Sequence, residues 1–511
     1  GATGADGADE LRARLAERVE RSSLAADSKR RVVDFVGEMI GATTPASLAL
    51  LAARTDAMTM SDQTQRAFVE LLGMCCDEGP VLLSIDDAQW CDRASFRLLE
   101  GAARELESKP LALVALARPD FDEAFPTAFA ERALTRLALP ALGKRAAETL
   151  VREVASAAPD EIVAELVKRG EGNPFMLEEL ARGVREGRSL ETLGGTTALA
   201  AARFESLSAD ARRVLRAASI VGQQLSPRAV ASLLACEPEA PWLAAAWIEL
   251  ERAEIVAARG EELAFRHALL RDAAYATLTA EDKTLGHKLA ARFFDASPSS
   301  DPMVVAVHAD RGGDEELAAR AYVDAAQRAL EASDLGGALE RATSAIRAGA
   351  SGELLARAER VATEACFWLG SLREVTEHAA RAMQTVGPGA AEFFVVGGFA
   401  VIAWARLGQG DAALETTKRL LTASGAASPA VAAARASALL EAASMLALQG
   451  QLDLAKAILR ELKPSIEPLA TSEPHLPARY ARSRSICAMA SGDLEAHVAG
   501  AREAATRFAE L

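Results

Sequence analysis

Residues 81–90 read VLLSIDDAQW, a short apolar run that ends in two aspartates. Pro80 precedes the run and interrupts the helical pattern before it. A run of this length, bounded by a helix breaker and by acids, predicts a buried β-strand. In open α/β sheets, ligands bind beyond the carboxyl ends of the strands. Asp86 and Asp87 are therefore candidate functional residues.

The residues on either side predict a parallel sheet covered by helices. Apolar positions recur three and four residues apart over most of 10–74, which indicates helices. After the first strand, RASFRLLEGAAREL (93–106) is helix-like, and LALVALAR (111–118) is a second strand-like run. LTRLALP (134–140) is a third. Apolar strands that alternate with helices are typical of a parallel sheet.

The next segments predict a helical lid, a linker and a small mixed module. Residues 143–184 are helix-like, and 183–195 have the composition of a linker. Residues 199–278 contain two strong helix starts, Ser208 as an N-cap and Ser226 followed by proline. Two extended pieces then surround Gly260. Helices with a small hairpin in this length predict a winged-helix module.

From about residue 300 the sequence is Ala-rich, helical and repetitive. A small residue at a predicted turn is followed five positions later by a second residue that packs between helices. The matches are SDLGGA (333–338), GSLREV (370–375), GQGDAA (408–413), GQLDLA (450–455) and GDLEAH (492–497). Their spacing predicts a solenoid of helical hairpins of the tetratricopeptide kind. The alternative is a helical bundle without repeats.

The composition excludes several classes of function. Charged residues make up 25% of the 511 residues and the formal net charge is −15, so we expect no nucleic-acid partner. The six cysteines form no C-x-x-C motif, which favours a reducing, cytoplasmic location. The longest apolar run, residues 393–405, is shorter than the roughly 20 residues of a membrane span. We expect it to be a buried helix, and we expect no membrane contact.

The pattern at 81–87 is that of a Walker B motif. In such a motif Asp86 would hold the hydration shell of Mg²⁺, and Asp87 would orient or activate the attacking water. The alternative is a strand whose aspartates only begin a turn.

Three further segments follow in order: LARPD (116–120), GNPFMLEEL (172–180) and FRHALLRDAAYATL (265–278). With them the chain resembles the STAND class of signal-transducing AAA-type ATPases. It is most similar to the ATPase-plus-repeat regions behind bacterial Ser/Thr protein kinase or adenylate/guanylate cyclase domains, and less similar to MalT-like transcription activators. The motifs are specific within 80–280 and generic in the repeats.

The resemblance implies roles for three more residues. Arg118 stands where relatives place a sensor arginine that faces the γ-phosphate, whereas the alternative is a surface residue at a strand end. Pro174 matches a proline that packs on adenine, although Asn173-Pro174 also suits a helix start. His267 matches a histidine that contacts the ADP β-phosphate. Because Arg266 and Ala268 replace the Met and Asp of that motif, a structural hydrogen-bonding role is the alternative for His267.

No G-x-x-x-x-G-K-[ST] phosphate-binding loop (Walker A, or P-loop) occurs in the sequence. The nearest match, LGKR (142–145), lacks the first glycine and the hydroxyl residue and follows the Walker B pattern. One expectation is that the P-loop lies upstream of Gly1. The other is a degenerate ATPase. We expect an ATPase in the parent protein. Whichever expectation holds, we expect this chain alone to have little activity and to bind ATP, ADP and Mg²⁺ weakly or not at all.

The sequence therefore predicts a mainly α protein with a partial α/β P-loop-type core, a winged-helix module and a TPR-like solenoid. The expected domains are a nucleotide-binding core (1–142), a helical lid and linker (143–195), a winged helix (196–285) and repeats (286–511). The expected function is the regulatory part of an ATP-dependent switch. Its repeats would bind a protein or peptide, and an output domain would precede it in the parent chain. An inactive interaction scaffold is one alternative. A MalT-like regulator is the other, but its basic C-terminal helix-turn-helix is not in this sequence.

Overall fold

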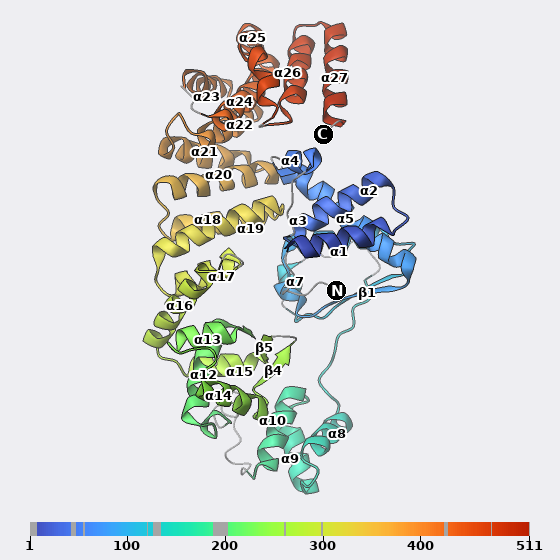
Figure 1. Ribbon diagram of the computed structural model, residues 1–511, viewed down its shortest axis with the longest axis vertical. Coiled ribbons are helices and arrows are strands. Elements are labelled where there is room, and N and C mark those ends of the chain that lie inside the picture. The colour runs from blue at the N-terminus through green and yellow to red at the C-terminus, as the bar shows by residue number, and fades with distance from the viewer. Residues whose placement is uncertain are drawn as a thin grey trace. The chain divides into compact units, whose positions relative to one another are not determined.

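The computed structural model describes residues 8–41, 47–54, 57–119, 121–125, 134–187, 203–259, 262–297, 300–423, 428–471 and 473–509. The chain is mainly helical, with two small sheets (Figure 1). It divides into two compact units, Gly1–Ala133 with Ala319–Leu511, and Leu134–Ala318. Most of the expected linker at 183–195 lies outside the described residues.

The first segment of the chain is helical, as its periodicity predicts. Phe35 and Leu50 are fully buried among its helices. A π-helical turn, η1, interrupts the pattern at Val32–Val36. The helices are α1 (Ala8–Glu20), α2 (Ala26–Arg31), α3 (Gly37–Met39), α4 (Leu48–Arg54) and α5 (Ala57–Glu78).

Two parallel strands follow, β1 (Val81–Ile85) and β2 (Leu111–Ala115), paired in register from Val81↔Leu111 to Ile85↔Ala115. They are connected by a short 3₁₀ turn, η2 (Ala88–Trp90), and by α6 (Arg93–Glu105). Asp92 caps α6, since its Oδ1 accepts the Ser95 N–H at 2.8 Å. Leu83 and Leu111 pack against a core formed by α5 and α6. Helix α7 (Phe121–Ala124) follows β2.

The prediction of a third strand at 134–140 is wrong. These residues form no regular structure, and Leu137 and Leu139 are 82% and 89% exposed. The physical reason is that a strand is stabilised by its ladder of hydrogen bonds to a neighbour. Among the described residues, β1 and β2 pair only with each other, so 134–140 has no strand to join.

The second unit begins with three helices, α8 (Lys144–Val154), α9 (Asp160–Gly170) and α10 (Pro174–Arg185), around a core that includes Leu166, Leu177 and Leu180. A mixed segment follows. Its elements are α12 (Ala209–Val221), β3 (Gln224–Leu225), α13 (Pro227–Leu233), α14 (Pro241–Arg252), β4 (Val256–Arg259), β5 (Glu262–Phe265) and α15 (Ala268–Ala276).

The three short strands of this segment form an antiparallel sheet in the order β3-β5-β4. Both predicted caps are confirmed. Ser208 accepts the Ala211 N–H, and Ser226 accepts the Ala229 N–H with proline at the first helical position. Two further helices, α16 (Ala280–Asp295) and α17 (Pro302–Arg311), pack on each other.

The predicted repeats are pairs of helices (Figure 1). The pairs are α18 (Glu315–Glu331) with α19 (Leu335–Arg347), α20 (Gly352–Leu369) with α21 (Leu372–Thr385), α22 (Ala391–Arg406) with α23 (Gly410–Thr422), α24 (Pro429–Leu448) with α25 (Leu452–Leu469), and α26 (Leu476–Ala490) with α27 (Leu494–Ala509).

Each predicted turn falls between the two helices of a pair. All five turn residues have the left-handed backbone that favours glycine, with φ of 57°, 81°, 75°, 84° and 79° at Ser333, Gly370, Gly408, Gly450 and Gly492. Of the residues five positions later, Ala338, Val375, Ala413 and Ala455 are fully buried. His497 in the last pair is half-buried, which agrees with its being the weakest match.

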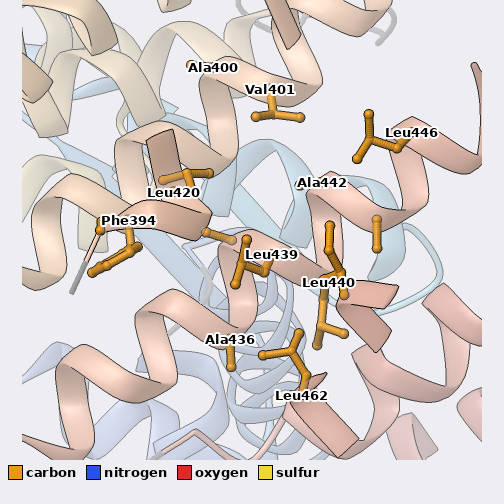
Figure 2. Packing of buried hydrophobic residues seen from close by; sticks show 14 of the residues in the cluster. Phe394, Ala400, Val401, Leu420, Ala436, Leu439, Leu440, Ala442, Leu446 and Leu462 are labelled. Carbon is orange, nitrogen blue, oxygen red and sulfur yellow. The ribbon is translucent and has the colours of Figure 1, made fainter. Parts of the chain in front are cut away.

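The core of the repeats is built from Ala and Leu, with few aromatic side chains. Phe394 of α22 and Leu439 and Leu440 of α24 are fully buried there (Figure 2). The apolar run at 393–405 is the buried helix α22, as predicted. Helix α24 is long and apolar enough to cross a membrane by length and composition, but the burial of Leu439, Leu440 and Leu446 is typical of a core helix.

Candidate functional site

The acidic residues of the first strand lie where that strand meets the end of the second. Asp86 and Asp87 directly follow β1, and both side chains are exposed. The Asp87 backbone is left-handed (φ 53°), and its N–H donates to Asp86 Oδ1 at 3.1 Å. This backbone conformation is uncommon for a residue other than glycine and is often found at functional sites.

A glutamine connects the two strand ends. The Gln89 side chain is 8% exposed. Its Nε2 donates to Asp87 Oδ1 at 2.9 Å, and its Oε1 accepts the backbone N–H of Arg118 at 3.1 Å. Gln89 thus connects Asp87 to Arg118, three residues beyond the end of β2. The sequence reasoning missed Gln89, because nothing in its spacing distinguishes it from a surface residue of a turn.

The main chain reinforces this connection. Leu116 N–H donates to Ile85 O, and Ala88 N–H donates to Leu116 O, both at 2.8 Å. The structure therefore brings Asp86, Asp87 and Arg118 to adjacent strand ends, as the sequence predicts for neighbouring parallel strands. No group of three or more His, Cys, Asp or Glu side chains suited to a metal occurs in the described part of the chain. A pair of carboxylates suits Mg²⁺, which keeps several of its waters.

The segments that carry Pro174 and His267 meet in the second unit, through the neighbour of Pro174. Pro174 is the exposed first residue of α10, and Asn173 caps that helix by accepting the Met176 N–H at 3.2 Å. The ring of the next residue, Phe175, meets the His267 ring edge-on, with centroids 4.7 Å apart. Residues from two sequence motifs that are far apart in the chain are therefore neighbours.

His267 is partly buried at the start of α15. Burial lowers the pKa of His267, and the nearby Arg266 lowers it further, while Glu178 and Glu179 oppose the change. The imidazole is therefore mainly neutral near pH 7. A neutral ring can donate one hydrogen bond to an anion, but it brings no charge of its own.

Next to His267, a buried network of ion pairs joins α10 to the segment that follows it. Arg203 Nη1 donates to Glu179 Oε1 at 2.7 Å, and these side chains are 4% and 7% exposed. Arg182 and Arg266 both form ion pairs with Glu254. Burial alone would raise the pKa of Glu254, but the two arginines lower it below its usual value. These ion pairs could not be predicted from the sequence, since the partners are far apart along the chain.

The nearest match to a phosphate-binding loop shows no such loop in the structure. Gly143 precedes α8 and Lys144 begins it. The Lys144 ammonium lies 4.0 Å from Glu148 and is 80% exposed. These residues form an ordinary helix start.

Comparison with known proteins gives weak relationships. No known family profile matches the chain. An uncharacterized protein of Rhizobium meliloti (strain 1021) is 25% identical over 324 residues, which are 58% of this chain and 30% of that protein. The chain thus spans less than a third of the length of this relative.

Among solved structures, the chain is similar to a Signal Transduction ATPase with Numerous Domains (STAND) protein with a tetratricopeptide repeat sensor from Pyrococcus horikoshii. The two are 13% identical, and the match covers 99% of this chain and 76% of the other, with a TM-score of 0.38. At this TM-score the likeness by itself carries no argument about fold or function.

Proposed function

We propose that this chain is the regulatory part of an ATP-dependent signalling switch of the STAND class. One observation carries the proposal: Asp86, Asp87 and Arg118 stand at adjacent carboxyl ends of two parallel strands, and Gln89 joins them. This edge of a parallel sheet is where nucleotides and Mg²⁺ bind in α/β proteins. Two acids and a guanidinium there suit a metal–phosphate ligand.

The proposed roles follow from the position of each side chain. Asp86 would hold the hydration shell of Mg²⁺, whose charge neutralises phosphate oxygens when it is bound. Asp87 would accept a proton from, or orient, the attacking water. Gln89 restrains one carboxylate oxygen of Asp87, and the other would face that water. Arg118 would bind the γ-phosphate oxygens and register their loss.

Two residues of the second unit have proposed nucleotide contacts of their own. Pro174 would pack on adenine, and the neutral His267 ring would donate to an ADP phosphate. The order of helices and strands from α12 to α15, with its antiparallel β3-β5-β4 sheet, supports the assignment of this segment as a winged-helix module. Movement of that module with the nucleotide state would be the switch.

The phosphate-binding half of the site would come from sequence outside residues 1–511. Two features support this view. Leu82 and Val114 are exposed on the sheet, although strands of parallel sheets are normally covered on both faces. Residues 134–140 have the composition of a strand but pair with no strand among the residues that the structure describes. On this view the parent protein is an ATPase and this chain alone is inactive.

The paired helices α18–α27 would bind a protein partner and relay the switch to a kinase or cyclase output domain, in the cytoplasm. A catalytically inactive scaffold is the second candidate. It is favoured by the well-packed array of helical pairs, which resembles the extended binding surfaces of repeat proteins.

Equilibrium nucleotide binding distinguishes the two functions. We expect the full-length parent protein to bind ATP in a Mg²⁺-dependent way, and Asp86→Asn to weaken the Mg²⁺ dependence while ADP binding without metal persists. We expect residues 1–511 alone to bind ATP weakly or not at all. A parent protein that binds no ATP would favour the scaffold, and micromolar ATP binding by residues 1–511 would refute the missing phosphate half.

A further inference from the structure

Most of the exposed large apolar side chains of the repeats lie at the turns; the exceptions in the described part of the repeats are Val498 and Phe508 of α27. Among the described residues between 335 and 494, every large apolar side chain that is exposed lies within three residues of a turn glycine. We call this set the turn edge. Their exposed fractions run from 38% to 69%, and the residues are Trp368, Leu369, Leu407, Leu448, Met489 and Leu494.

The helices that carry these side chains lie side by side. Ser444 of α24 contacts Ser483 of α26 at 3.0 Å. These residues lie six and nine positions before the glycines that end their helices, Gly450 and Gly492. Arg479 of α26 donates to Ser437 Oγ of α24 at 3.2 Å, and each of these residues lies 13 positions before its glycine, so the two helices are parallel with their ends nearly level.

The same arrangement holds for the two preceding helices. The Cβ position of Gly398 in α22 lies 3.3 Å from Ala438 of α24, and the rings of Phe367 in α20 and Phe399 in α22 lie 4.8 Å apart. Gly398 and Ala438 lie 10 and 12 positions before their turn glycines, and Cys366 of α20 and Ala403 of α22, which share one buried cluster, lie four and five positions before theirs. The carboxyl ends of α20, α22, α24 and α26 thus point the same way, which places the residues of the turn edge at the same end of the four helices.

The turn edge is also acidic. Within four residues of the four turn glycines, five acids outnumber the two arginines, Arg373 and Arg406. The acids are all exposed: Glu374, Asp411, Asp453, Asp493 and Glu495. The amino ends of α21, α23, α25 and α27 begin at the same turns as the carboxyl ends of α20, α22, α24 and α26, so the helix dipoles largely offset one another and the acidic side chains set the charge. One arginine, Arg406, already lies over an aromatic ring, that of Phe367, at 5.5 Å.

We propose that the turn edge binds an amphipathic helix of a partner protein, with an apolar face and basic flanks. Packed helices are about 8–10 Å apart, so four helix ends extend roughly 30 Å, the length of about 20 helical residues. The partner's apolar face would cover the exposed Leu, Trp and Met side chains, and its Lys or Arg residues would meet the acids. This surface is independent of the proposed nucleotide site.

The test uses residues 1–511 and two synthetic 20-residue helices with the same leucine face, one with lysines and one with glutamates on the polar face. We expect the lysine peptide to bind at least about ten-fold more tightly in a fluorescence anisotropy titration, and to bind more weakly as salt rises. Equal binding of both peptides, or binding of neither, would overturn the proposal.

Variants locate the binding surface. Leu407→Ser with Leu448→Ser should weaken lysine-peptide binding by about ten-fold, and Asp411→Asn with Asp453→Asn should remove most of its salt dependence. The matched control is Leu285→Ser in α16, which is exposed but lies outside the turn edge. Circular dichroism checks that each variant is folded. If Leu285→Ser weakens binding of the lysine peptide as much as the Leu407/Leu448 variant does, the proposal is contradicted. It is also contradicted if the wild-type chain is a dimer that the Leu407/Leu448 variant dissociates, because the turn edge would then bind a second copy of the chain.

Discussion

The Nδ1 atoms of His287 and His308 lie 2.9 Å apart in a buried contact between α16 and α17. The other nitrogen of His287, Nε2, lies 2.8 Å from the Tyr275 hydroxyl, and His308 also has a hydrogen bond with the Val221 backbone. One arrangement of neutral rings satisfies these contacts: Tyr275 donates to His287, His287 donates to His308, and His308 donates to the main chain. The chain of hydrogen bonds joins four helices of the second unit.

This contact predicts a loss of stability in acid. Burial, the neighbouring ring and Arg311 lower the pKa of His287 to about 4, and burial and Arg311 lower the pKa of His308 to about 4. In the unfolded chain both would titrate near 6.5. The unfolded state therefore binds protons that the folded state does not. Stability is fully present above pH 6.5 and falls as the pH drops from 6.5 towards 4, by up to about 1.4 kcal/mol per pH unit for each histidine.

Urea unfolding followed between pH 7.5 and 4.5 checks this expectation. The control is a variant with both histidines changed to glutamine, which titrates at all other groups but not here. We expect the variant to be less stable at pH 7.5 and the difference to shrink as the pH falls. A constant difference would show that the two rings are not the cause.

The pairing of Glu179 with Arg203 predicts a strongly non-additive mutant cycle. Removing either partner leaves the other charge buried, so Glu179→Gln and Arg203→Met should each lower the free energy of unfolding of the second unit by about 3–5 kcal/mol. The double variant should recover much of this loss. Thermal and urea unfolding of the four proteins measures the coupling, and additive losses would count against a buried pair.

The turn glycines predict a purely conformational effect. Gly450 has φ 84° and open space where a Cβ would be, so Gly450→Ala should cost about 1–2 kcal/mol from backbone strain alone. Gly387 has the same open space, but its φ is not positive, so an alanine there causes no backbone strain. Gly387→Ala is therefore the matched control, and we expect it to be neutral or slightly stabilising. Equal effects at both positions in urea unfolding would refute the argument.

Features that depend on neighbouring residues along the chain could be predicted from the sequence, whereas contacts between distant residues could not. The caps at Ser208 and Ser226 and the turn at Gly450 depend on residues within a few positions, so their signals are local. The strand expected at 134–140 failed because a strand depends on a neighbour that the pattern cannot supply.

The candidate site divides in the same way. The position of Asp87 at a strand end followed from the apolar run before it. The role of Gln89 did not, because its partner Arg118 lies 29 residues away. The contact of His287 with His308 likewise joins two helices, and no repeating pattern in the sequence predicts it.

At the start of α10, variants of two neighbouring residues distinguish a helix-capping role from a ligand-binding role. Asn173→Ala removes the cap on the Met176 N–H and should lower stability by about 1 kcal/mol. Pro174→Ala should change stability little, because that side chain is exposed. If Pro174 packs on adenine, the proline variant of the full-length protein should bind ATP several-fold more weakly at unchanged stability. Isothermal titration of both variants distinguishes the roles, and unchanged affinity for Pro174→Ala would remove that residue from the site.

The central claim is that Asp87 acts on the water that attacks ATP. Its direct test is steady-state ATP hydrolysis by the full-length parent protein, with Asp210→Asn, an exposed helix residue of the second unit, as the matched control. We predict that Asp87→Asn lowers turnover by at least about a hundred-fold while ATP binding is retained, and that the control hydrolyses ATP like the wild type. Turnover that is unaffected by Asp87→Asn would contradict the account.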